Sequence, residues 1–126
     1  NIITIPHLGA STPESEENCA IMAVQQVMDF LENGSIRNSV NFPTCELHDP
    51  VKNRIVNAHD NVPNMVGQIT TALAKHKINI SDMVTRHRKS IGYNIIEVEG
   101  NLNEEIADEI RNIEGIRMVR VIRPVP

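Results

Sequence analysis

Aromatic side chains are scarce in this chain of 126 residues, which has two Phe, one Tyr and no Trp. Proteins that bind single-stranded nucleic acid stack the bases on aromatic side chains, so a surface of that kind is excluded. Positively charged residues are also few: the chain has 12 Lys and Arg but 16 Asp and Glu, which gives a formal net charge of −4. A chain without a basic excess lacks the charge that neutralises phosphates. We therefore expect no nucleic-acid partner.

Long apolar runs and closely spaced cysteines are missing too. No stretch approaches the roughly 18 apolar residues that cross a bilayer, and the first residues lack the order of a signal peptide. We therefore expect a cytoplasmic protein with no membrane partner. Cys19 and Cys45 lie far apart and no CxxC pair is present, which argues against a disulfide framework and a thiolate zinc site. We expect two reduced, packed thiols and no metal.

The first third of the chain predicts one strand and one long helix. Ile2-Ile3-Thr4-Ile5 is a β-branched run that favours a strand. Ser11 followed by Glu14 is a capping-box pattern, Pro13 suits a first turn, and Asn33-Gly34 is typical of a helix end. A strand and a helix cannot bury an apolar stripe alone, so we expect a piece of a larger domain. The stripe repeats at intervals of three and four over Ala20, Ala23, Val24, Val27, Phe30 and Leu31.

Residues 35–52 show neither period and predict a connecting segment. Beyond them the pattern predicts the order β-α-β-β-α-β, a ferredoxin-like α+β fold with one antiparallel four-stranded sheet and both helices on one face. Gly92 suits the turn between the second and third strands. The expected strands are 54–59, 78–86, 93–99 and 116–122, and the expected helices are 63–76 and 102–113, with Gly115 as the stop of the second.

Two functions that use this topology are excluded by composition. An RNA-recognition module needs aromatic residues and positive charge on its central strands, whereas the third predicted strand offers only Tyr93 and carries Glu97. A metal carrier of this fold would need a CxxC pair in the first loop, which here runs from His59 to Pro63.

Motifs along almost the whole chain resemble one family. The second part, with His59-Asp60-Asn61-x-Pro63, Ile78-Asn79-Ile80 and Gly92-Tyr93, resembles the ACT regulatory domain of D-3-phosphoglycerate dehydrogenases. The first part, from Thr4 to Thr12 and at Val40-Asn41-x-Pro43, is similar to the end of the catalytic domain of D-2-hydroxyacid dehydrogenases. The resemblance implies three parts: residues 1–43 from the dehydrogenase domain, residues 44–52 as a linker, and residues 53–126 as the ACT domain.

The resemblance also implies a parent enzyme that oxidises 3-phosphoglycerate to 3-phosphohydroxypyruvate with NAD, in serine biosynthesis. His7 would be its general acid/base, a task that suits an imidazole, and Gly9 and Ala10 would lie at the cofactor. Taken without the family, a His beside Pro in a strand-to-helix turn favours a structural role for His7. No G-x-G-x-x-G loop is present, so we expect this piece alone to bind no cofactor and to be inactive.

For the ACT domain the resemblance implies a homodimer or higher homo-oligomer that pairs edge to edge. L-serine would be the effector at the seam, held by His59 and Asn61 of one chain and Asn79 of its neighbour. Asn amides offer both donors and acceptors to an amino acid. In the structural alternative, Asn61 caps a helix and Asn79 is a turn residue. Asn64 stands where the family usually has Gly, which bears on whether serine is sensed.

A second hypothesis keeps the ACT domain and changes its host. The chain would then be an amino-acid-binding module of another 2-hydroxyacid dehydrogenase or of a non-catalytic sensor. The oligomer size, the affinity for the effector and the substrate of the upstream domain do not follow from these residues.

Overall fold

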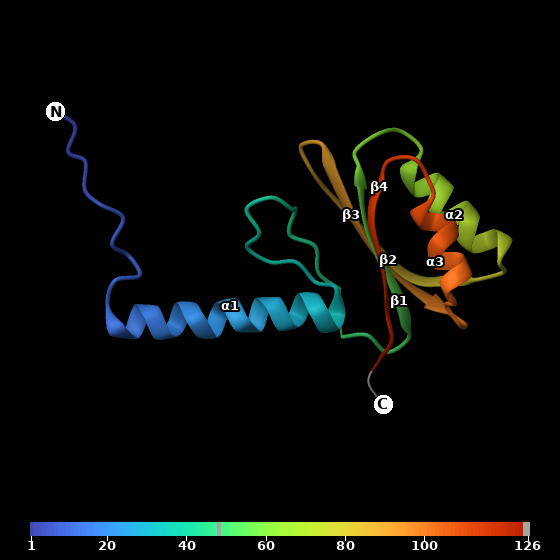
Figure 1. Cartoon of the computed structure of the whole chain (residues 1–126), viewed down its shortest axis with the longest axis horizontal. Coiled ribbons are helices and arrows are strands. Elements are labelled where there is room, and N and C mark those ends of the chain that lie inside the picture. The colour runs from blue at the N-terminus through green and yellow to red at the C-terminus, as the bar shows by residue number, and fades with distance from the viewer. Residues whose placement is uncertain (48, 125–126) are drawn as a thin grey trace.

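The computed structural model of the chain describes residues 1–47 and 49–124. One residue of the predicted linker 44–52 and the last two of the predicted domain 53–126 lie outside the described residues. Among the described residues, no helix combines the length and apolar character that a membrane crossing requires. The elements, shown in Figure 1, are α1 (Pro13–Asn33), β1 (Asn53–Asp60), α2 (Met65–Lys75), β2 (Asn79–Arg88), β3 (Ile91–Glu99), α3 (Glu104–Arg111) and β4 (Ile116–Ile122).

The four strands form one antiparallel sheet in the order β2-β3-β1-β4, with α2 and α3 on one face (Figure 1). This arrangement confirms the predicted ferredoxin-like α+β fold. The register pairs Ile55 with Ile96 at the centre of the sheet, and both side chains lie in the core beneath the helices. The buried members of that core are Ile55, Ile69, Ala72, Leu73, Ile96, Val98, Leu102, Ile106, Ala107, Ile110 and Val119.

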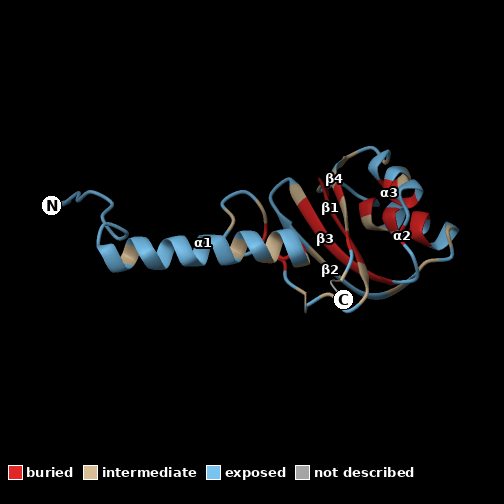
Figure 2. Cartoon of the chain, turned by 60° about the horizontal axis from the view of Figure 1, so that its bottom comes forward, coloured by how far each residue is buried: buried red, intermediate tan, exposed pale blue. Residues whose placement is uncertain are grey.

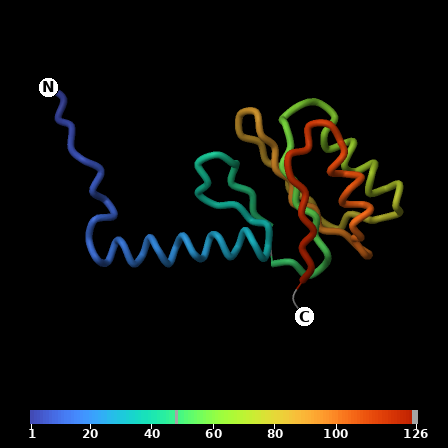
Figure 3. The backbone as a smooth tube through the Cα atoms, in the orientation of Figure 1, coloured from blue at the N-terminus to red at the C-terminus, as the bar shows by residue number. Residues whose placement is uncertain are grey.

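The other face of the sheet is covered by the segment that follows α1, which Figure 3 shows running beside the strands. Ile36 and Cys45 form a short antiparallel bridge, with N–O distances of 2.8 and 2.9 Å. Both side chains pack against Val56 and Tyr93 in a second apolar cluster. Burial raises the pKa of the Cys45 thiol to about 11, so this thiol stays protonated and packs as an apolar group.

The carboxyl end of α1 is bound to the same face of the sheet by side chains. The last turn of the helix contains no basic residue, so the cations that favour this negative end of the helix dipole come from the strands. These cations are Arg54 and Arg120. Arg54 in addition forms an ion pair with Glu97 at 3.0 Å, and both side chains of this pair are buried. The bonds to the helix end run from Arg120 to Phe30 O (2.6 Å), from Arg54 to Asn33 O (2.9 Å) and from the Tyr93 hydroxyl to Gly34 O (2.7 Å).

Most of α1 is exposed, as Figure 2 shows by colour, and no residue of the helix is buried. The predicted apolar stripe is therefore uncovered along most of its length, with Val24, Val27 and Leu31 all more than half exposed. The expectation that Cys19 is packed is wrong, because its thiol lies on this exposed helix. The physical reason is that no layer of the described structure lies against the first two thirds of α1.

Three local predictions are corrected by the structure. Residues 2–5 form no strand, because an extended segment needs a neighbouring strand to accept and donate its backbone hydrogen bonds. The cap of α1 is Thr12 and not Ser11, since the Thr12 hydroxyl accepts from Ser15 N at 3.2 Å. The turn between β2 and β3 is Lys89-Ser90, with Lys89 at φ 55°, whereas Gly92 lies inside β3.

We expect Gly34→Ala to lower the free energy of unfolding by about 2 to 4 kcal/mol. Gly34 has φ 77°, and a Cβ there would lie 2.5 Å from Val56 Cγ1. Gly9→Ala is the matched control, because nothing lies within 4 Å of a Cβ at Gly9. Urea unfolding of both variants measures the difference. Equal stability of the two variants would contradict the close approach of the helix end to β1.

Candidate functional site

The strongest candidate site lies at the end of β1, where His59 is buried at 1% exposure. Its Nδ1 lies 2.7 Å from Asp60 O, and because a carbonyl oxygen only accepts, Nδ1 carries the proton and donates. In the neutral ring Nε2 is then an acceptor. This Nε2 is buried and has no hydrogen-bond partner among the described residues. The site therefore presents one unused acceptor.

Gly92 makes room for the His59 ring. The two residues are opposite each other in the β1–β3 pair, and a Cβ on Gly92 would lie 2.6 Å from His59 Nε2. His87 of β2 is the neighbour of Gly92 on its other side. Its ring lies edge-on to the His59 ring, with 5.9 Å between the ring centroids. Gly92 was expected to serve the turn, but its role in the structure is to let the imidazole lie across the sheet.

The loop from β1 to α2 is held against the β2–β3 hairpin by Asn61. Its side-chain amide donates to Lys89 O at 3.1 Å, and its backbone N–H donates to Ser90 O at 2.9 Å. Asn61 does not cap α2, because the capping position is occupied by Asn64. The alternative role expected for Asn61 is therefore wrong, although its side chain does carry a structural bond.

Asn64 has the left-handed conformation, with φ 65°, that glycine adopts most easily. Its side chain makes no capping bond and lies over Gly67, where a Cβ would meet Asn64 Oδ1. The left-handed turn is thus kept although Asn stands where the resembled family usually has Gly. The first amides of α2 are left uncapped by this side chain, which is the arrangement that binds anions at helix ends.

These residues line a depression of about 560 Å³ at the amino end of α2. It combines the free acceptor of His59 with the uncapped amides of the helix, and Met65 and Val66 are among its lining residues. A zwitterion fits this pair of features, because its ammonium group needs an acceptor and its carboxylate needs donors.

Asn79 lies at the opposite end of β2 from this depression. In the β2–β3 register Asn79 pairs with Glu99, whereas Arg88 pairs with Ile91 beside the hairpin turn. The Asn79 amide donates to Glu99 Oε2 at 2.9 Å. The hydrogen bond from Lys52, and then that from Asn79, hold the pKa of the Glu99 carboxyl below its usual value. Within one chain the structure brings His59 and Asn61 together but leaves Asn79 apart from them, in β2 and not in a turn.

His7, Gly9 and Ala10 lie on the exposed segment before α1, at the end of that helix farthest from the sheet (Figure 1). The segment's one regular feature is a turn in which Ser11 N–H donates to Leu8 O at 3.1 Å. The predicted catalytic and cofactor residues are therefore separated from the depression at His59, and the two candidate sites are distinct.

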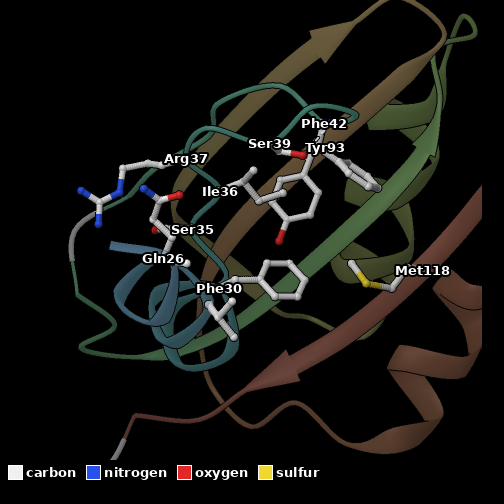
Figure 4. A pocket seen from close by; sticks show the side chains of 11 residues that line it. Gln26, Phe30, Ser35, Ile36, Arg37, Ser39, Phe42, Tyr93 and Met118 are labelled. Atoms are coloured by element: carbon white, nitrogen blue, oxygen red, sulfur yellow. Dashed lines mark hydrogen bonds between the residues drawn. The ribbon is translucent and has the colours of Figure 1, made fainter. Parts of the chain in front are cut away.

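A second concavity, of about 470 Å³, lies between the end of α1 and the sheet. Figure 4 shows Phe30, Ile36 and Tyr93 around it. The Tyr93 hydroxyl already donates to Gly34 O, and Arg37 is paired with Asp29 and Glu46. The walls of this cleft are mainly apolar side chains, and its main polar groups already have partners within the chain. A zwitterion therefore fits it poorly.

The sequence analysis missed three polar residues on the helix-covered face of the sheet. Asn94 donates to Asn57 Oδ1 at 2.8 Å, and both side chains are fully buried. Thr85 is the neighbour of Asn94 across the β2–β3 pair. The available signal was an Asn at each of two positions where alternation within a central strand predicts an apolar side chain.

No family model matches the chain. In sequence it is similar to D-3-phosphoglycerate dehydrogenases: it is 33% identical over 123 residues to that of Dictyostelium discoideum and 30% identical over 124 residues to that of Haemophilus influenzae. Each match covers 97% of this chain and 30% of the relative. The enzyme of Escherichia coli K12 is 28% identical over 109 residues, 86% of this chain and 26% of that enzyme. The chain thus spans less than a third of the length of these relatives.

Among solved structures, the acetolactate synthase small subunit from Thermotoga maritima aligns over 59% of this chain and 48% of that chain, with TM-score 0.51 and 19% identity. An unknown protein from Galdieria sulphuraria aligns over 60% and 46%, with TM-score 0.51 and 15% identity. The ACT domain from GTP pyrophosphokinase of Chlorobium tepidum aligns over 56% of this chain and 95% of that domain, with TM-score 0.49 and 19% identity. The first two matches show a shared fold.

We expect Gly92→Ala to destabilise the chain because its methyl group meets the His59 ring. The cost is about 1 to 3 kcal/mol for overpacking at a buried site. The same change in a His59→Ala background should cost less than half as much, since the ring is gone. Urea unfolding of the four proteins in this double-mutant cycle gives the coupling between the two positions. Equal costs in both backgrounds would show that His59 does not depend on the space above Gly92.

Proposed function

We propose that this chain, which is similar over 97% of its length to D-3-phosphoglycerate dehydrogenases, is the regulatory part of such an enzyme with the end of the catalytic domain attached. The whole enzyme would be cytoplasmic and would use NAD to oxidise 3-phosphoglycerate for serine biosynthesis. The second part of the chain would be an ACT domain that binds L-serine as a feedback effector. The observation that carries the proposal is the buried His59, which lines the depression at the start of α2 and whose Nε2 has no hydrogen-bond partner among the described residues.

The chemistry of the depression supports an amino acid as its ligand. The carboxylate of L-serine would accept from the backbone amides of Met65 and Val66, at the positive end of α2. The ammonium group would donate to Nε2 of the neutral His59 ring, in which Nδ1 donates to Asp60 O and Nε2 is the acceptor. Asn61 would form the wall of the site while it holds the loop against the hairpin.

A second copy of the chain is needed to bring Asn79 to this site. β2 is an edge strand of the sheet, and its unpaired backbone groups can pair with the same strand of another copy. A two-fold axis makes that pairing antiparallel, so the Asn79 end of one β2 lies beside the Arg88 end of the other. Asn79 of the partner subunit would then reach the rim of the depression at His59. We therefore propose a homodimer, with its ligand at the seam.

For the first part of the chain we propose that His7 is the general acid/base of the complete enzyme. The similarity extends over this segment, because the matches to the enzymes of Haemophilus influenzae and Dictyostelium discoideum each cover 97% of the chain. The cofactor loop and the groups that orient His7 would come from the part of the enzyme outside this chain. The alternative, a module of another 2-hydroxyacid dehydrogenase or of a non-catalytic sensor, is not favoured, because the relatives named above are D-3-phosphoglycerate dehydrogenases.

We expect calorimetric titration to show that L-serine binds the dimer of this chain. Asn79→Ala should weaken binding by about 5- to 150-fold, because it leaves a polar group of the ligand unsatisfied. Asn61→Ala should also weaken binding, because it removes the bond that holds the loop of the site against the hairpin. Asn101→Ala, on an exposed loop, is the matched control and should leave the affinity unchanged.

Two further results would decide what the domain does. If Asn64→Gly binds L-serine and the native chain does not, the loop is a disabled sensor. If neither protein binds L-serine at millimolar concentration, the serine-sensor proposal is wrong and the domain serves assembly alone. A strict monomer by light scattering at the concentrations of the titration would remove the seam and the contribution of Asn79.

In the complete enzyme, we expect His7→Ala to reduce kcat by about 10²- to 10⁴-fold, the usual loss for a general acid/base. Thr12→Ala is the control, because it removes the cap of α1 and should lower stability with little effect on kcat. Steady-state kinetics with 3-phosphoglycerate and NAD measures both variants. If the kcat of the His7→Ala enzyme is within a factor of three of the native value, His7 is not the general acid/base and its role is structural.

A further inference from the structure

Opposite charges lie on either side of the middle of the edge strand β2. Asp82, Val84 and Arg86 are alternate residues of this strand, so their side chains lie on one face of the sheet. It is the face toward the segment after α1, because Val84 is the neighbour of Ile95 and packs against the apolar cluster there. Asp82 and Arg86 are both exposed. The edge of the sheet therefore presents one negative and one positive group, two residues before and two residues after Val84.

This arrangement of charges is complementary to itself. A second copy that adds its β2 to this edge about a two-fold axis runs antiparallel to the first. Side chains directly opposite each other in an antiparallel pair lie on the same face, with their Cβ atoms about 4.5 to 5.5 Å apart. An axis through Val84 places Asp82 of each copy opposite the partner's Arg86. The seam then contains two identical ion pairs, one on each side of the axis.

Other registers of the same two strands pair these charges less well. An axis at Asp82 or at Arg86 places two like charges opposite each other, which destabilises a strand pair. An axis one residue before Val84 places Asp82 opposite the partner's Val84, which has no charge. An axis at Thr85 pairs Asp82 with the partner's Arg88, but the Arg88 guanidinium already donates to backbone oxygens of the segment after α1, one of them at 2.8 Å. The axis through Val84 is therefore the one that pairs both charges of each copy.

The same register agrees with the position that the proposed function requires of Asn79. With the axis at Val84, the Asn79 end of one β2 lies beside the hairpin turn of the other copy. In that turn Lys89 O accepts from the side chain of Asn61 at 3.1 Å. Asn79 of the partner subunit therefore comes next to the loop that Asn61 holds in place.

We infer that Asp82 and Arg86 recognise a second copy of this chain and fix its register at the β2 edge through two symmetric ion pairs. The inference rests on the proposed homodimer, because it names the residues that make this edge selective. The backbone groups of an edge strand can pair with any extended segment. Charges at fixed positions, by contrast, reject the strands and the registers that bring like charges together.

The test exchanges the charges and measures the dissociation constant of the dimer of the full chain by analytical ultracentrifugation. Asp82→Arg and Arg86→Asp should each raise this constant by about 10-fold or more, because each variant puts two like-charge pairs into its own seam. An equimolar mixture of the two variants should form a heterodimer of nearly native affinity, since each of these positions then meets an opposite charge again. Asp108→Arg, the same change at an exposed position of α3, is the matched control and should leave the constant unchanged.

Asp82→Asn and Arg86→Gln are milder variants that decide the matter if a charge reversal does not fold, and each should raise the dissociation constant by about 2- to 10-fold. A native chain that is monomeric overturns the proposed homodimer together with this inference. A native dimer whose variants keep its affinity, or a mixture that does not recover it, overturns the inference alone. Recovery of Asp82→Arg by Arg88→Asp in place of Arg86→Asp overturns the register and leaves the homodimer in place.

Discussion

The two central strands are covered on both faces, and the rest of the structure depends on this constraint. β1 has six consecutive buried residues and β3 has seven, with α2 and α3 on one side and the segment after α1 on the other. A polar side chain on either strand cannot reach bulk water, so it must find its partner inside the protein. The pair Arg54–Glu97 meets this demand on one face, whereas the pair Asn57–Asn94 meets it only in part on the other.

On the face toward α1, the polar residues of the strands serve to hold the helix. The guanidinium groups of Arg54 and Arg120 and the hydroxyl of Tyr93 donate to carbonyl oxygens at its end. Burial raises the pKa of the Tyr93 phenol, so this group stays protonated and remains a donor. The direction of α1 is therefore set by the sheet, although most of the helix contacts nothing in the described structure.

On the helix-covered face, polarity is concentrated at one end of the strands. The core beneath α2 and α3 is apolar at Ile55 and Ile96, and it becomes polar at the next pair on the same face, Asn57 and Asn94, toward the start of α2. Proteins commonly give up stability where a ligand is bound, because the groups that await the ligand are unsatisfied without it. The position of the polar groups therefore agrees with the place where the β1–α2 loop forms a depression.

From α1 onward, the order of the helices and strands was determined by the sequence itself, because apolar periodicity and the helix stop at Gly34 are local signals. Gly115 was expected to end the last helix, but α3 already ends at Arg111 with Asn112 as its cap. His59 and Asn61 were proposed from a motif on one loop, through its resemblance to the ACT domain. Only the tertiary structure decided that residues 2–5 lack a strand partner, that Gly92 makes room for His59, and that Asn57 and Asn94 meet across two strands. Each of these depends on residues distant in the sequence that come together only when the sheet forms, and a pattern along one segment carries no information about what lies across from it.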